Sequence, residues 1–162
     1  MKEKINLIQF LPYFPPHKWG LETVAEELSF FYVKNEYGEV FNIIFDVWQP
    51  SPLAPLPKVE VDNREYIKNK SGNIIGYKQK GYTVYLLPSF DLVFNFPFPK
   101  FWKKEFWEIL KITWTFTKNN KTIVQTHTRF FLSSFLGWLF AKFYKLKWVH
   151  IEHWSEYVLL WS

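Results

Sequence analysis

The sequence contains no cysteine, which excludes disulfide bonds, thiolate metal sites and cysteine nucleophiles. Glycine is scarce, with six residues in 162, and neither glycine-rich phosphate loop, G-x-x-x-x-G-K-S/T or G-x-G-x-x-G, is present. The G-x-S-x-G elbow of serine hydrolases and the H-E-x-x-H pair of zinc enzymes are missing as well. No apolar run reaches the roughly 20 residues that a membrane-spanning helix needs. The chain therefore has no self-contained nucleotide cradle, and a serine hydrolase and a transmembrane protein are disfavoured.

Histidine is the remaining candidate for metal binding. His127, His150 and His153 are the residues that a site would need. His150 and His153, however, flank the end of one predicted strand, so that their side chains should point in different directions. We therefore expect no metal and no cofactor.

The composition indicates a single folded domain with an uneven distribution of charge. Hydrophobic residues make up 48% of the chain and aromatic residues 22%, which is too apolar for disorder. The net charge of +5 comes from residues 82–162, because residues 1–81 hold as many acidic as basic side chains. Basic residues alternate there with Trp and Phe, which favours an anionic membrane surface over nucleic acid. No signal peptide is predicted, and we expect a cytoplasmic location, with peripheral contact at the inner face of the membrane left open.

Strands and helices alternate along the sequence, which predicts an α/β fold. An apolar strand over Ile5–Phe10, a helix over residues 21–35 and a strand over residues 40–47 form one βαβ unit. Residues 48–80 interrupt the alternation and are interpreted as an insertion whose second part is a hairpin or a surface excursion. The later elements predicted from periodicity are a strand at 82–87, a helix at 100–118, a strand at 122–126, a helix at 128–144 and a strand at 147–151. The fold class predicted is a Rossmann-like open parallel sheet with helices on both faces.

Three features should meet where the parallel strands end. Ligands of open parallel sheets bind at the carboxyl ends of the strands. The loop over residues 12–20 follows the first strand, His127 ends the strand at 122–126, and Glu152 with His153 follow the last strand. Each feature alone is more often structural, as a turn or as a hydrogen-bonded histidine, but their convergence predicts a site.

The residues of these features resemble motifs of glycosyltransferase family 4. The segment Pro15–Glu22 with the helix that follows is similar to the P-P-x-x-G-G-x-E loop of that family. Residues 126–131, Thr-His-Thr-Arg-Phe-Phe, resemble its strand-end histidine motif, and Val149–His153 resembles its next strand. The resemblance covers nearly the whole chain except residues 48–80.

This resemblance implies one half of a GT-B architecture, the N-terminal, acceptor-side domain of a retaining hexosyltransferase. It implies a nucleotide-sugar donor, bound mainly by a C-terminal domain that this sequence lacks, and a glycan or lipid-linked acceptor; the isolated chain would be inactive. His127 would be the catalytic residue, facing the acceptor and the transferred sugar. Glu22 would hold the loop after the first strand. The substrate-binding residues implied are His17, Lys18, Gly20, Glu22, Arg129, Glu152 and His153.

Tryptophan occupies positions where the family has glycine. Trp19 stands in the loop itself, Trp154 follows His153, and Trp138 follows Gly137. An indole at position 19 would obstruct the approach of a phosphate. One hypothesis is that UGA codons, read as glycine in some bacteria, were translated as tryptophan; UGG codons in the gene would refute it. The alternative is a diverged homologue.

A second function remains open, a non-catalytic module of a truncated or decayed homologue that docks on a membrane or a partner. The residues proposed for a membrane surface are Phe96, Phe98, Lys100, Phe101, Lys103, Lys104 and Trp107. The residues of the same helix expected to pack on the sheet are Trp102, Phe106, Ile109 and Leu110.

Overall fold

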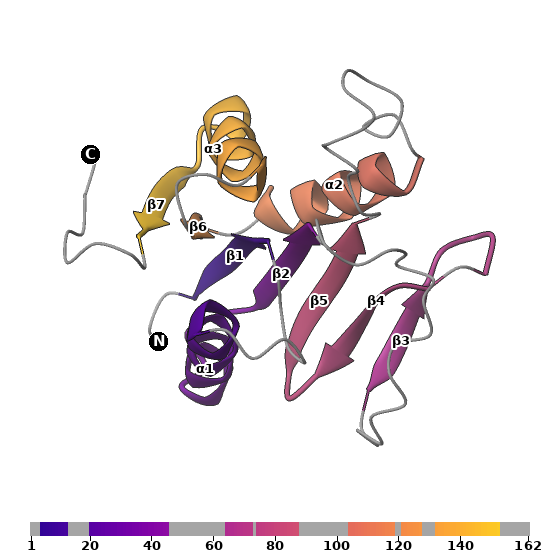
Figure 1. The fold of residues 1–162 in the computed structure, drawn as a ribbon, viewed down its shortest axis with the longest axis horizontal. Coiled ribbons are helices and arrows are strands. Elements are labelled where there is room, and N and C mark those ends of the chain that lie inside the picture. Colours follow the sequence, from indigo (N-terminus) through magenta and orange to yellow (C-terminus); the bar gives the residue numbers. More distant parts are fainter. Residues whose placement is uncertain are drawn as a thin grey trace.

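The structure, a computed structural model, describes residues 4–12, 20–45, 64–72, 74–87, 104–118, 121–127 and 132–152. These residues form three helices and a seven-stranded sheet of order β3-β4-β5-β2-β1-β6-β7 (Figure 1). The elements in chain order are β1 (Ile5–Leu11), α1 (Gly20–Lys34), β2 (Val40–Phe45), β3 (Glu65–Lys68), β4 (Ile74–Gln79), β5 (Tyr82–Leu87), α2 (Lys104–Thr117), β6 (Lys121–His127), α3 (Leu132–Tyr144) and β7 (Lys147–Ile151).

Five neighbouring strands, β5, β2, β1, β6 and β7, are parallel. Helix α1 connects β1 to β2, α2 lies between β5 and β6, and α3 lies between β6 and β7, which is the alternation predicted from the sequence. Figure 1 shows α1 on one side of the strands and α2 and α3 on the other. The predicted Rossmann-like α/β class, with helices on both faces, is therefore confirmed, and it is consistent with one half of a GT-B architecture.

The sheet is mixed rather than purely parallel, because the segment predicted to be a hairpin or a surface excursion adds antiparallel strands to one side of it. Of the two alternatives, a hairpin or a surface excursion, residues 65–79 form the hairpin. Strands β3 and β4 are antiparallel, and β4 is also antiparallel to β5. The reason is the link from β4 to β5, which consists of Lys80 and Gly81 with φ angles of 48° and 84°. Two residues can join only antiparallel neighbours, because a parallel crossover needs a dozen or more. The outermost strand β3 has four residues and a break in register between Ile67 and Lys68.

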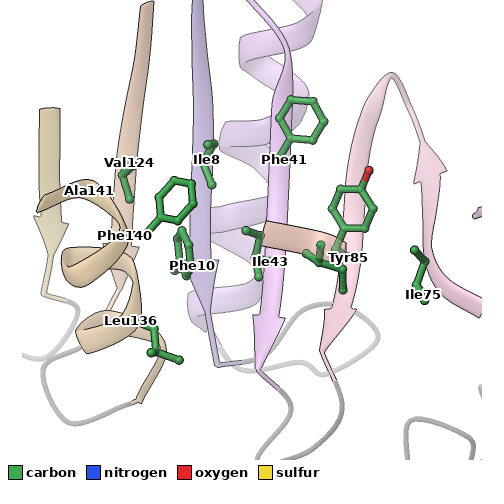
Figure 2. Close-up of a cluster of buried hydrophobic side chains, with 11 residues drawn as sticks. Ile8, Phe10, Phe41, Ile43, Ile75, Tyr85, Val124, Leu136, Phe140 and Ala141 are labelled. Atoms are coloured by element: carbon green, nitrogen blue, oxygen red, sulfur yellow. The ribbon is translucent and has the colours of Figure 1, made fainter. Parts of the chain in front are cut away.

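One face of the sheet packs against α2 and α3. Side chains alternate along β1, so that Ile8 and Phe10 point to this face while Leu7 and Leu11 point to α1. Figure 2 shows the resulting cluster of aliphatic and aromatic side chains. Its buried members are Ile8, Phe10, Phe41, Ile43, Ile75, Tyr85, Ile109, Val124, Leu136, Phe140 and Ala141.

Helix α3 lies very close to the sheet because its position 137 is a glycine. A methyl group on Gly137 would be 2.3 Å from Cγ2 of Thr126 and 3.0 Å from Cβ of Phe10. The neighbouring Trp138 lies on another side of the helix, where Nζ of Lys142 is 4.9 Å from its ring centre. In α2, Ile109 and Leu110 pack on the sheet as predicted. Among the residues described, no helix is long and apolar enough to span a membrane.

The other face packs against α1 and holds two buried tyrosines. Burial raises the pKa of the Tyr77 phenol to about 12, an effect that Arg64, 4.5 Å from the ring centre, partly opposes. Burial also raises the pKa of Tyr82, whose hydroxyl donates a hydrogen bond of 2.9 Å to Glu26. Both phenols are therefore neutral in the folded protein.

This burial predicts a loss of stability in alkaline solution. The unfolded phenol titrates near pH 10, whereas that of Tyr77 titrates near 12 when folded. The stabilisation is complete below pH 10 and is lost as the pH rises from 10 to about 12, by roughly 2–3 kcal/mol for this group. Urea denaturation at several pH values should show a shallower decline for Tyr77→Phe than for wild type. The exposed Tyr37→Phe is the control, and equal slopes for all three proteins would contradict the prediction.

Candidate functional site

The topology places a candidate site at the carboxyl ends of β1 and β6. The chain passes from β1 to β2 on one side of β1, and later to β6 and β7 on the other. Open α/β sheets bind ligands where the strand order reverses in this way, outside the carboxyl ends of the strands. At this edge β1 ends at Leu11 and β6 ends at His127.

A row of three amide side chains crosses the central strands on the face of α1. Gln9 of β1 is paired with Asn42 of β2 on one side and with Gln125 of β6 on the other. All three side chains are buried, and Gln9 and Asn42 have no exposed surface. Nε2 of Gln9 donates to Oδ1 of Asn42 at 2.8 Å, and Nε2 of Gln125 donates to Oε1 of Gln9 at 3.1 Å. The amides therefore form one hydrogen-bonded chain across three strands.

Helix α1 packs on the amide row and forms hydrogen bonds with it. Nε2 of Gln9 also donates to Oγ of Ser29 at 2.8 Å and to the backbone carbonyl of Ala25 at 3.2 Å. The Ser29 hydroxyl donates to the same Ala25 carbonyl at 2.7 Å, as in many helices where serine bonds the fourth residue before it. A buried polar group is tolerated when it is hydrogen-bonded, and this network satisfies that requirement within the core.

His127 joins the network at the edge of the sheet. It lies two residues beyond Gln125 on β6, and therefore on the same face, and its side chain is fully buried. Its Nε2 atom lies 2.7 Å from Nε2 of Gln125 and 3.0 Å from Oε1 of Gln9. The structure thus gives His127 a defined orientation, held from the interior of the protein through Nε2.

The amino end of α1 points to the same edge. Ala25 and Ser29 lie over Gln9, while the later residue Tyr32 donates from its hydroxyl to the carbonyl of Ile5 at the start of β1. The helix therefore runs opposite to β1, and its first residue, Gly20, precedes Ala25 by five positions. At 1.5 Å per residue this places Gly20 about 7–8 Å further toward the carboxyl edge. A helix amino terminus there favours anionic groups.

A second polar cluster occupies the opposite face of the same edge. The Trp148 indole donates to Oγ1 of Thr126 at 3.0 Å, so that the Thr126 hydroxyl can donate to Nδ1 of His150 at 2.9 Å. Nε2 of His150 lies 3.8 Å from a carboxylate oxygen of Glu152. Thr126 and His127 are successive residues of β6 and point to opposite faces, so this cluster is separated from His127 by the sheet.

The structure thus separates the site residues predicted from the sequence. His127 and Gly20 lie at one edge on the face of α1, and Glu22 belongs to the first turn of the same helix. Glu152 lies beside His150 rather than beside His127. Outside the described residues are His17, Lys18, Arg129 and His153. Within the described residues, no group of three His, Asp or Glu side chains is arranged to hold a metal ion.

Sequence interpretation missed the amide row. Gln9, Asn42 and Gln125 lie inside strands that their apolar neighbours predict, and their polar side chains do not change that prediction. Their positions along the strands are the feature that could have indicated the row. Gln125 and His127 are two residues apart on one strand, so their side chains point to the same face of the sheet. Polar residues in the middle of three adjacent buried strands need one another as partners.

The outer surface of α3 is apolar. Phe135, Leu139 and Phe143 follow one another at intervals of four residues and are 55%, 44% and 77% exposed. The helix contains no acidic residue, and its one basic side chain, Lys142, lies over Trp138. Trp107 of α2 is also exposed, as expected for the membrane surface proposed from the sequence. The described residues therefore present an exposed apolar stripe away from the amide row.

The chain is similar to a curated protein over nearly its whole length. The chain is 32% identical over 161 residues to a protein of Methanocaldococcus jannaschii named as an uncharacterized glycosyltransferase. The aligned region is 98% of this chain and 35% of the relative, so the chain spans about a third of the length of the curated relative it matches. No family model matches the chain, and no solved structure matches it.

Proposed function

We propose that this chain is the acceptor-side domain of a glycosyltransferase that moves a sugar from a nucleotide-sugar donor to a glycan or lipid-linked acceptor. The observation that carries the proposal is the position of His127, held from the interior at the carboxyl end of β6, where the strand order reverses. Similarity to a relative named as a glycosyltransferase supports the reaction class.

The proposal assigns a role to each group of residues predicted at this edge. The amino end of α1, which begins at Gly20, would bind the donor diphosphate, because a helix amino terminus favours anionic groups. His17 and Lys18 would add to this anion site, and Glu22 would hold the loop. His127 would contact the transferred sugar, and Arg129 and His153 are further proposed substrate-binding residues. A second domain would bind the nucleotide, and transfer would occur with retention of configuration.

The test compares two histidines on opposite faces of one edge. In the natural full-length polypeptide that contains this chain, His127→Asn should lower kcat/KM for nucleoside diphosphate release from the donor by about tenfold or more. His150→Asn, on the face of α3, should change it less than about threefold. The measurement is release of nucleoside diphosphate from a panel of nucleotide sugars with and without acceptor extracts. Equal effects of the two substitutions, or no sugar transfer, would overturn the proposal.

A second candidate, a membrane-docking module, is favoured by the exposed stripe on α3. The exposed lysines around it, Lys142, Lys145 and Lys147, would complement anionic lipid, and Phe143 would enter the interface. Sedimentation with vesicles containing phosphatidylserine should retain the wild-type chain, and Phe143→Ser should weaken that binding. If this chain binds the vesicles and its full-length form transfers no sugar, the second function is favoured.

A further inference from the structure

The helices give the two sides of the sheet opposite charges. Residues 20–39, which comprise α1 and the residues between it and β2, contain five glutamates and one lysine. Residues 109–151, which include most of α2 and all of α3, contain several Lys and one Arg but no Asp or Glu. Helix α1 lies on one side of the strands, and α2 and α3 lie on the other (Figure 1). The described part of the molecule therefore has an acidic side and a basic side.

The acidic face is the outer side of α1 together with Tyr37, and it is partly apolar. Val24 and Phe31 are exposed on the helix, and Tyr37 is exposed beside them, with its ring centre 5.9 Å from that of Phe31. Two exposed glutamates border these side chains. Glu27 precedes Phe31 by one helical turn, and Glu36 precedes Tyr37 in the chain. This face thus combines aromatic surface with negative charge.

The basic face is formed by the outer sides of α2 and α3. Its exposed apolar side chains are Trp107, Phe135, Leu139 and Phe143. The exposed Lys111 follows Trp107 by one turn of α2, and the exposed Lys142 is a neighbour of Leu139 on α3. Further exposed lysines end the two helices, at positions 118 and 145. This face thus combines apolar surface with positive charge.

The two faces together hold the exposed apolar surface of the helices. Among the described residues, the large hydrophobic side chains that are exposed outside the β3–β4 hairpin all belong to these faces. Contiguous exposed apolar patches mark interaction sites. An anionic membrane would account for the basic face only, because it repels the acidic one, and two like faces would repel each other. A contact between unlike faces covers both and pairs opposite charges.

We propose that copies of this chain associate head to tail, with the acidic face of one copy against the basic face of the next. The apolar helix surfaces supply the buried centre of the contact, and the glutamates and lysines around them fix its orientation. Because the faces lie on opposite sides of one sheet, each copy can bind one neighbour on each side, and association continues beyond the dimer. The contact does not use the carboxyl ends of β1 and β6, so it is independent of sugar transfer.

Charge reversal on one face at a time tests this contact. Sedimentation velocity of the 162-residue chain from about 5 to 500 μM should show species larger than a dimer. Lys111→Glu with Lys142→Glu makes both faces acidic, and Glu27→Lys with Glu36→Lys makes both basic. Each double variant alone should raise the apparent dissociation constant by about tenfold or more. An equimolar mixture of the two should restore association, because every acidic face again meets a basic one.

The matched control is Lys68→Glu with Lys70→Glu on the β3–β4 hairpin. It changes the net charge as much as the first variant, at exposed positions outside both faces, and should associate like wild type. Circular dichroism checks that each variant is folded. A mixture that associates no better than its components would overturn the proposal, as would a wild type that stays monomeric. If that monomer sediments with vesicles containing phosphatidylserine, the basic face is assigned to anionic lipid instead.

Discussion

Replacement of Gln9 by alanine is expected to lower the free energy of unfolding by about 3–5 kcal/mol. Gln9 is fully buried and is the only member of the amide row that contacts both Asn42 and Gln125. Its removal leaves polar atoms of Ser29 and His127 without this partner and opens a cavity between β1 and α1. Both effects act in the same direction, because an unsatisfied buried polar group and an empty volume each destabilise the folded state.

Urea denaturation followed by tryptophan fluorescence measures this loss. The matched control is Gln79→Ala, the same chemical change on β4, where the side chain is partly exposed and accepts one hydrogen bond from Arg64. The control should lose less than about 1 kcal/mol. A difference between the two variants within experimental error would mean that the amide row contributes nothing specific to stability.

Substitution of Gly137 by valine is expected to lower the free energy of unfolding by about 2–3 kcal/mol. A Cβ atom there would lie 2.3 Å from Cγ2 of Thr126, well inside van der Waals contact, so α3 would have to move away from β1 and β6. That movement would loosen the packing of Phe140 on Phe10, whose ring centres are 5.5 Å apart. The higher helix propensity of a residue other than glycine offsets only a small part of the loss.

Two comparisons isolate the steric origin of this loss. Leu139→Val introduces the same β-branched residue on the exposed side of α3 and should cost less than about 1 kcal/mol. Thr126→Ser removes the closest atom, Cγ2, and keeps the hydroxyl that contacts His150 and Trp148. It should therefore partly restore the stability of Gly137→Val in the double variant. Strictly additive effects of the two changes would refute a direct contact as the cause.

The sequence predicted the central elements because their hydrophobic periodicity is unambiguous. The strands at 82–87 and 147–151 have the predicted bounds, and β1 extends only one residue further, to Leu11. Parallel strands buried on both faces leave long apolar runs that few other structures produce. The segment at 65–79 was ambiguous because β3 is largely exposed and its side chains carry no clear alternation. Its pairing depends on the turn at Lys80 and Gly81, a feature of local backbone geometry.

Less of the candidate site could be predicted. The pattern of residues predicts that His127 ends a strand and that a helix begins close to Gly20, as the structure shows, whereas their roles come from the resemblance alone and stay predictions. The partners of His127 are distant in the chain, since Gln9 precedes it by 118 residues, and only the strand order brings them together. Periodicity gives the face of each side chain but not which strands are neighbours. The separation of Glu152 from His127 likewise depends on the pleat of β6 and β7.

Among the described residues, β3 is the strand at one edge of the sheet, and this bears on how the protein behaves at high concentration. An exposed sheet edge is a template to which other chains add strands, the first step of open-ended aggregation. Strand β3 offers four residues, a break in register between Ile67 and Lys68, and exposed charges at Glu65 and Lys68. A strand from another chain that paired with β3 would form few backbone hydrogen bonds, and it would bury the charged side chains of Glu65 and Lys68. The hairpin that makes the sheet mixed thus also protects it against uncontrolled polymerisation at this end.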